Sequence, residues 1–143
     1  MLYNPAPARE TDKEMIPFCD FIPPNEPECS ELFPDKKLEE IIKIYPNKMI
    51  VTLGVEGSIY YDGTAVKKIP AIKAEVVDTT GAGDTFNGAF AYAISKGKEM
   101  NVALSFATIA SHLSVQRFGA QGGMPSLKEI KEHSGYEEIW DFK

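Results

Sequence analysis

The chain has 143 residues, a formal net charge of −6 and 43% hydrophobic residues. This length suits one domain with its own core, and the composition is typical of a globular chain rather than a disordered one. The acidic balance argues against binding to duplex DNA, which requires a basic surface, but not against nucleotides, because backbone amides can hold phosphates. We expect no membrane span and no signal peptide. Two isolated cysteines, Cys19 and Cys29, favour a reducing cytoplasm.

The first half of the chain contains several candidate strands. Residues 1–3 resemble the end of a strand, and residues 20–22 predict another short one before two prolines. Residues 49–53 form a continuous apolar run, which is typical of a strand buried on both faces. Residues 58–61 and 64–69 flank an Asp-Gly turn and predict a hairpin.

Two helices are expected between these strands. Thr11, with Glu14 three residues later, has the spacing of a capping box and predicts a helix over 11–18. Asp35 is placed to cap a second helix that ends at Ile44.

The second half is expected to be mostly helical. Val76 and Val77 predict a strand end, after which apolar residues recur at helical spacing until Gly97. A second long helix is expected over 102–113, and Ser126 is placed to cap a short one. The overall pattern is of the α/β class.

The segment 78–84 carries the strongest chemical signal. Gly81 and Gly83 permit positive φ angles and a close approach of the backbone to a ligand. The first amides of the helix that follows would have no internal partners and could hold an anion. Asp84 is placed to accept a proton from an attacking hydroxyl. An aspartate in the first helical turn is also a common cap, so both roles remain open.

Two known phosphate-binding motifs do not match this segment. The dinucleotide fingerprint requires a small sixth residue, and the chain has Phe86 at that position. A Walker A loop requires Gly-Lys-Ser/Thr, which the sequence lacks.

The longer string at 78–88, DTTGAGDTFNG, resembles the signature of the ribokinase-like, or PfkB, family of carbohydrate kinases. Further segments agree with this family in the same order. They are NPAPA at 4–8, NEPE at 25–28, TLGVEG at 52–57 and RFGAQ at 117–121. The NPAPA segment favours the ribokinase branch over the fructokinase and adenosine kinase branches.

In this family ATP donates its γ-phosphoryl group to a sugar hydroxyl, and the resemblance favours ribose, giving ribose 5-phosphate. The resemblance implies that Asp84 is the general base and that Gly81, Ala82 and Gly83 form the anion hole. It implies a nucleotide site that consists of Asn25, Thr52, Gly54, Glu56, Gly57, Gly83, Asp84 and Thr108. The family often has His or Asn where this chain has Thr108, so an ordinary helical role is the alternative there.

The resemblance also implies two metal sites. Asn25 and Glu28 would act at Mg²⁺, Glu28 through water. Without the resemblance, Glu28 would be interpreted as a solvent-exposed acid. A monovalent cation, K⁺, would be held by Asp78, by the Thr80 carbonyl and by carbonyl groups at the end of the second long helix and in the loop that follows it. The full set is Asp78, Thr80, Ser114, Arg117, Gly119 and Gly123, the last at a position where the family commonly has Ser.

The resemblance covers nearly the whole chain but only the C-terminal half of the family's pattern. It implies that residues 1–143 are the ATP-binding C-terminal part of a three-layer αβα kinase fold, without the N-terminal half and the β-sheet lid. We therefore expect a chain that binds nucleotide but is catalytically incomplete. The alternatives are another sugar or nucleoside kinase of this family, or a non-catalytic nucleotide-binding or interaction fragment. Its sheet edge near Met1 could form a homo-oligomer or pair with the missing half.

Overall fold

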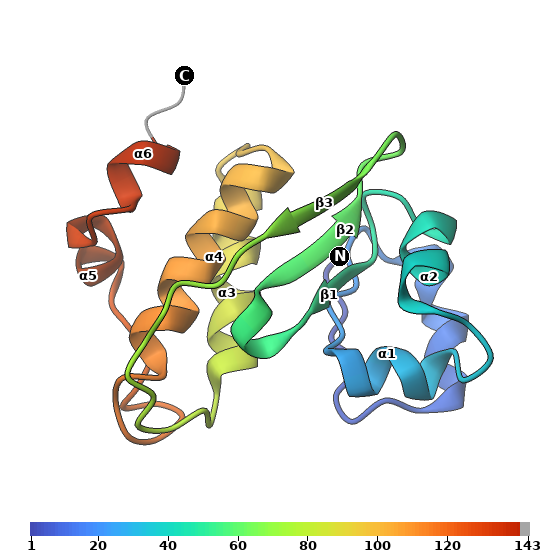
Figure 1. The fold of residues 1–143 in the computed structure, drawn as a ribbon, viewed down its shortest axis with the longest axis horizontal. Helices are drawn as coiled ribbons and strands as arrows, with labels where there is room; N and C mark the ends of the chain where they lie inside the picture. Colours follow the sequence, from blue (N-terminus) through green and yellow to red (C-terminus); the bar gives the residue numbers. More distant parts are fainter. Residues whose placement is uncertain (141–143) are drawn as a thin grey trace. The chain divides into compact units, whose positions relative to one another are not determined.

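The computed structural model describes residues 1–140 and divides the chain into two compact units, Met1–Pro70 and Ala71–Lys143. The first unit combines a small sheet with helices, and the second is helical (Figure 1). No helix in the described part is both long and apolar enough to cross a membrane.

The sheet of the first unit has three antiparallel strands in the order β1-β2-β3. They are β1 (Ile50–Thr52), β2 (Ser58–Tyr61) and β3 (Val66–Ile69). Ile50 and Val51 are fully buried, so the prediction of a buried strand is confirmed. The predicted hairpin is confirmed as well, since Tyr61 pairs with Val66 next to the turn.

Two extended segments continue beside β1 through single parallel bridges. Leu2 pairs with Phe21, and Ile22 pairs with Met49. The predicted strand at 20–22 is therefore reduced to bridges. The prolines that follow it explain this, because they have no amide hydrogen and cannot extend a ladder.

The helices of the first unit are η1 (Glu10–Phe18, a 3₁₀ helix), α1 (Glu26–Leu32) and α2 (Leu38–Ile44). The predicted caps at Thr11 and Asp35 are wrong by two residues, because η1 is capped at Arg9 and α2 at Lys37.

The physical reason is the same for both helices. A carboxylate three residues further on reaches back to the cap amide: Asp12 accepts from Arg9 at 2.6 Å and Glu40 accepts from Lys37 at 2.8 Å.

Both cysteines lie in the core of the first unit. Cys19 and Cys29 are free and buried among apolar side chains that include Ile22, Leu32 and Met49. Burial raises the pKa of the Cys29 thiol to about 11.

In the second unit the remaining helices surround α4 (Met100–Ser114). These are α3 (Ala82–Ser95), α5 (Leu127–Glu132) and α6 (Tyr136–Trp140), and each packs against α4. Phe106 of α4 is central to this packing: its ring centroid lies 5.8 Å from that of Tyr92 and 6.3 Å from that of Tyr136. The two predicted long helices and the Ser126 cap are confirmed.

The predicted strand end at Val76 and Val77 is wrong. Both side chains are more than half exposed, at 52% and 61%. Within the described residues the segment joins no strand. Its amides at Val77 and Asp78 instead donate to the Val115 carbonyl, at 2.8 and 3.2 Å. Apolar residues alone therefore do not produce a strand here.

Candidate functional site

The turn before α3 depends on one glycine. Gly81 caps the helix with a left-handed backbone, φ +78°, and a Cβ there would lie 2.9 Å from the Ala120 Cα. Gly81 therefore provides both the conformation and the space for close contact with the loop after α4. Gly83 differs from the expectation, because it lies inside the helix without a positive φ and with open space around its Cβ position.

The start of α3 leaves amides free to bind a ligand. Ala82 donates to the Thr79 carbonyl at 3.1 Å, and Thr85 donates to the Gly81 carbonyl at 2.9 Å. Between them, the amides of Gly83 and Asp84 have no hydrogen-bond acceptor in residues 1–140. Both residues are exposed, so these N–H groups and the positive end of the 14-residue helix could bind an anion.

Asp84 is exposed in the first turn of α3, beside these free amides. The next side chain, Thr85, is buried, and its hydroxyl has no partner among the described residues. Sequence reasoning missed this hydroxyl, because a threonine near a helix start looks ordinary.

Asp78 links the turn before α3 to the loop after α4. One of its oxygens accepts from the Thr80 amide at 2.9 Å, and the other accepts from the Gly119 amide at 2.9 Å. Hydrogen bonds from the Thr80 side chain, the Thr80 amide and the Gly119 amide lower the pKa of Asp78. Asp78 therefore has a structural role, because it connects the turn before α3 with the loop after α4.

The loop after α4 directs three carbonyl oxygens toward one position. A Cβ on the buried Gly123 would lie 2.7 Å from the Gly119 oxygen, 2.8 Å from that of Ser114 and 3.6 Å from that of Arg117. Carbonyl oxygens are ligands for K⁺, and each carbonyl has two lone pairs. The donor set thus fits a monovalent cation. A serine at 123 would not fit this backbone, because its Cβ would collide with two of the oxygens.

In the first unit, Asn25 and Glu28 bind each other's backbone. The Asn25 side chain accepts from the Glu28 amide at 2.8 Å, and Glu28 accepts from the Asn25 amide at 2.9 Å, which caps α1. Asn25 also forms a parallel bridge with Thr52. A carboxylate and an amide oxygen fit Mg²⁺, which keeps several waters and takes few protein ligands.

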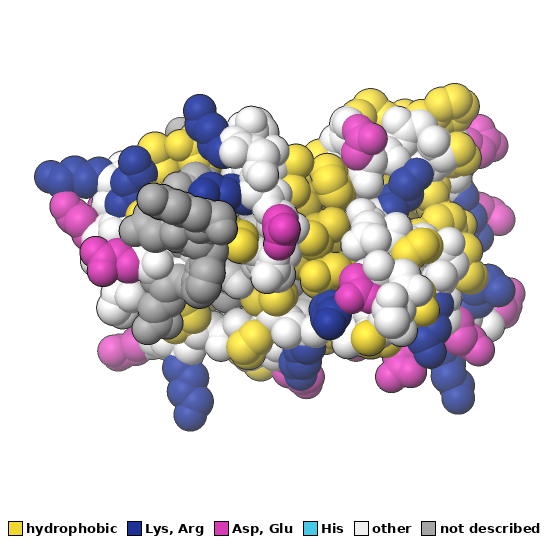
Figure 2. All heavy atoms as spheres, turned by 90° about the horizontal axis from the view of Figure 1, so that it is seen from above, with side chains coloured by type: hydrophobic (Ala, Val, Ile, Leu, Met, Phe, Trp, Pro, Cys, Tyr) yellow, Lys and Arg dark blue, Asp and Glu magenta, His cyan; other side chains and the backbone are white. Residues whose placement is uncertain are grey.

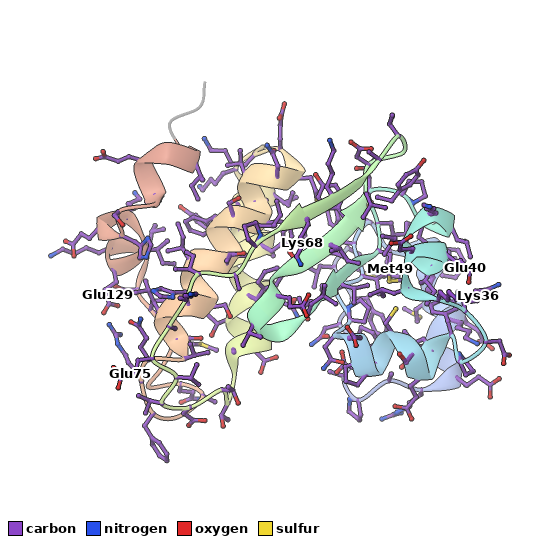
Figure 3. All side chains as sticks on the ribbon, viewed as in Figure 1. Lys36, Glu40, Met49, Lys68, Glu75 and Glu129 are labelled. Atoms are coloured by element: carbon purple, nitrogen blue, oxygen red, sulfur yellow. The ribbon has the colours of Figure 1, made fainter. Side chains whose placement is uncertain are left out.

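The segment 54–57 is a tight turn between β1 and β2. Gly54 and Gly57 both have positive φ angles, +57° and +98°, and Gly57 returns the chain so that its carbonyl accepts from Leu53 at 2.7 Å. Glu56 is exposed and pairs with Lys68 of β3 at 3.3 Å; Lys68 is labelled in Figure 3. The turn therefore exposes backbone groups at the end of β1.

Thr108 lies in the middle of α4. Its side chain is buried, and its hydroxyl donates to the Leu104 carbonyl at 2.8 Å. This bond matches the ordinary helical role that was the alternative for Thr108.

The predicted site residues fall into two groups, one in each unit. The first unit holds Asn25, Glu28, Thr52, Gly54, Glu56 and Gly57, and the second holds Asp78, Thr80, Gly81, Ala82, Gly83, Asp84, Thr108, Ser114, Arg117, Gly119 and Gly123. Within the units, the structure joins Asn25 to Thr52 and Asp78 to Gly119. On the face shown in Figure 2, basic and acidic side chains are interspersed.

Comparison with known proteins identifies the family and the fold. Residues 1–127 match the pfkB family of carbohydrate kinases. A ribokinase of Lactococcus lactis is 63% identical over 131 residues, covering 92% of this chain and 44% of that protein. The crystal structure of a ribokinase from Thermotoga maritima is 36% identical with a TM-score of 0.80, covering 91% of this chain and 47% of that one. The fold is thus ribokinase-like, and the chain spans about half the length of these proteins.

Two further structures contain ligands. A provisionally assigned ribokinase II of E. coli in complex with ATP and Mg²⁺ is 32% identical with a TM-score of 0.71, covering 78% of this chain and 38% of that one. Arabidopsis thaliana ribokinase complexed with ribose and ATP is 38% identical with a TM-score of 0.68, covering 78% and 39%. With the matched motifs and the free amides at the start of α3, these similarities give one conclusion: the chain belongs to the pfkB family of carbohydrate kinases.

Proposed function

We propose that residues 1–143 are the ATP-binding part of a ribokinase, which transfers the γ-phosphoryl group of ATP to a hydroxyl of ribose. The observation that carries this proposal is the start of α3, where two free amides lie beside the exposed Asp84 carboxylate. The ribokinases similar to this chain, two of them with bound ATP, support it.

In the proposed reaction the Asp84 carboxylate accepts the proton of the attacking sugar hydroxyl. The sugar oxygen forms a bond to the γ-phosphorus, the bond from this phosphorus to the bridging oxygen breaks, and ADP leaves. Negative charge on the transferred group lies against the amides of Gly83 and Asp84 and the positive end of α3. Positioning and charge stabilisation account for most of the catalysis in such transfers.

Nucleotide contacts are proposed for both units. In the first unit these are Asn25, Thr52 and the turn of Gly54, Glu56 and Gly57. In the second unit Thr108 is the weakest candidate, because its hydroxyl is used within α4. Asn25 and Glu28 would hold Mg²⁺, which neutralises phosphate charge when bound.

K⁺ is proposed at the carbonyl groups of Ser114, Arg117 and Gly119, with Asp78 and the Thr80 carbonyl. The convergence of three carbonyl oxygens near Gly123 supports this site. Gly123 has no side chain to offer as a ligand. Its role in this proposal is to leave space among the three carbonyl oxygens.

Pairing with the other half of a ribokinase, or with a second copy, is proposed at the edge formed by Leu2. Tyr3 donates to the Phe21 carbonyl at 3.0 Å and Phe21 donates to the Met1 carbonyl at 3.2 Å, so the amide and carbonyl of Leu2 face away from Phe21. Such an open edge can accept a strand. We also propose a cytoplasmic location, which the two free thiols support.

The test has two parts. Titration calorimetry with MgATP should detect binding to the isolated chain, and Asp84→Asn should leave much of that binding in place. A coupled ADP-release assay with ribose, Mg²⁺ and K⁺ should detect no turnover, because the chain spans about half of a ribokinase. No binding would contradict the nucleotide proposal, and robust turnover would contradict the proposed incompleteness.

A further inference from the structure

Helix α5 is tied to the loop after α4 by an ion pair that the sequence did not indicate. The Arg117 guanidinium donates to one oxygen of Glu129, which is labelled in Figure 3. The other oxygen of Glu129 accepts from the Ser126 amide at 2.7 Å and from its hydroxyl at 2.9 Å. Both oxygens are thus engaged, one with the loop and one with the start of α5.

The loop has few other side-chain anchors. Gln116, Arg117, Phe118, Gln121 and Met124 are all exposed, and Phe118 has 83% of its surface accessible. Apolar burial therefore contributes little to holding the loop in place. Its shape depends on backbone hydrogen bonds, on the contact of Gly119 with Asp78 and on the Arg117–Glu129 ion pair.

The same loop supplies the converging carbonyl groups. The Arg117 oxygen is the most distant of the three, at 3.6 Å from the Cβ position of Gly123, against 2.7 and 2.8 Å for Gly119 and Ser114. The side chain of Arg117 is thus held by Glu129, while its carbonyl oxygen lies with those of Ser114 and Gly119 around Gly123. Losing the anchor would affect this oxygen first.

We propose that Glu129 is a positioning residue for the monovalent-cation site, because its ion pair with Arg117 holds the loop carbonyls in their converging arrangement. This inference rests on the K⁺ site of the proposed function. In this role Glu129 does not bind the cation itself, because its oxygens are engaged with Arg117 and Ser126; it acts through the main chain of Arg117.

A purely structural role for Glu129 would be the capping of α5. Gln in the third helical position also completes a capping box, so Glu129→Gln keeps the cap and removes the charge and the second oxygen that pair with Arg117. Glu132→Gln is the matched control. It makes the same change on the same helix, at a residue that pairs with Lys128 at 3.7 Å and is not bonded to the loop.

The experiment measures the Tm of the 143-residue chain as KCl replaces choline chloride at constant ionic strength. A ligand that binds the folded state raises the Tm in a saturable way, which gives a K⁺ midpoint without any activity assay. We expect Glu129→Gln to raise this midpoint about two- to fivefold, the range for loss of an exposed ion pair. Glu132→Gln should leave the midpoint unchanged, and Arg117→Gln should raise it as Glu129→Gln does.

Equal midpoints for Glu129→Gln and Glu132→Gln would overturn the positioning role while leaving the K⁺ site in place. A wild-type Tm that does not respond to K⁺ would overturn the site and the inference together, while MgATP binding would still stand by its own titration. If Glu129→Gln does not fold, Arg117→Gln tests the same ion pair. An unchanged K⁺ midpoint in that variant would overturn the positioning role of Glu129.

Discussion

The two units prepare their predicted ligand sites in different ways. In the second unit the backbone provides the binding groups: two free amides at the start of α3 and three carbonyl oxygens around Gly123. In the first unit the predicted side chains already have structural tasks, since Asn25 and Glu28 cap α1 and Glu56 pairs with Lys68. Substitutions in the second unit should therefore act through conformation, and those in the first unit through chemistry.

The largest effect is expected for Gly81→Ala. The left-handed φ of +78° and a Cβ position 2.9 Å from the Ala120 Cα both disfavour any side chain. These penalties should destabilise the chain by about 1–3 kcal/mol and lower the Tm by about 3–10 °C. Gly83→Ala is the control, because that position is helical and open, so thermal unfolding should show no loss of stability. Equal losses in both variants would contradict the distinction between the two glycines.

A smaller loss of stability is expected for Gly123→Ser, which introduces the serine that the family commonly has at this position. Its Cβ would meet two carbonyl oxygens at 2.7 and 2.8 Å, so the loop must move at a cost of about 1–2 kcal/mol. Thermal unfolding with and without KCl should show a lower Tm and a weaker response to K⁺. Gly88→Ala, in open space on α3, is the control. A serine variant with the wild-type Tm and K⁺ response would show that the loop adapts freely.

A moderate, pH-dependent effect is expected from the histidine pair. The ring centroids of His112 and His133 lie 5.3 Å apart, and His133 Nδ1 accepts from the Gly135 amide at 3.0 Å. Burial, and then the nearby His112, lower the pKa of His133. The unfolded chain therefore binds more protons near pH 6 than the folded chain does. The contribution of His133 to the free energy of unfolding is fully present above about pH 6.5 and is lost as the pH falls.

The Tm measured from pH 7.5 to 5 checks this expectation. His133→Asn keeps an acceptor for Gly135 without an imidazole, so its Tm should fall less over the same range. Apart from His133, the His112 ring contacts the Ile72 carbonyl and the Gln116 amide, and neither of these two titrates. The same fall in both proteins would assign the effect to other groups.

The smallest effect on stability is expected for Glu28→Gln, which tests the first unit. Gln preserves the capping box, so the Tm should change by less than about 2 °C. If Glu28 acts at Mg²⁺, calorimetry should show weaker binding of MgATP with little change for ATP in EDTA. Glu31→Gln, on the same helix, should change neither value. A fall in Tm with unchanged MgATP binding would assign Glu28 to the cap alone.

The sequence predicted the elements that have strong periodicity or turn chemistry. Both long helices, the hairpin and the strand at β1 are confirmed, because apolar spacing and an Asp-Gly turn act locally. The errors occur where a group elsewhere in the chain, or a side chain three residues further on, determines the local hydrogen bonds. Val76 and Val77 form no strand, and the amides of Val77 and Asp78 donate to the Val115 carbonyl instead; the caps of η1 and α2 are set by carboxylates that reach back three residues.

The same division applies to the site. The resemblance identified Gly81, Asp78 and the loop after α4, and the structure joins these three. The Arg117–Glu129 ion pair and the buried hydroxyl of Thr85 could not be predicted, because neither a spacing of 12 residues nor an ordinary threonine carries a signal.

The two buried thiols have a practical consequence for measurement. Cys19 and Cys29 are each at most 3% exposed, and the Cys29 thiol, with a pKa of about 11, is almost fully protonated at neutral pH. A cysteine introduced at Val55, which is 89% exposed in the turn between β1 and β2, would therefore react first with a maleimide dye. A single fluorophore could then report on the proposed nucleotide turn without removal of either native cysteine.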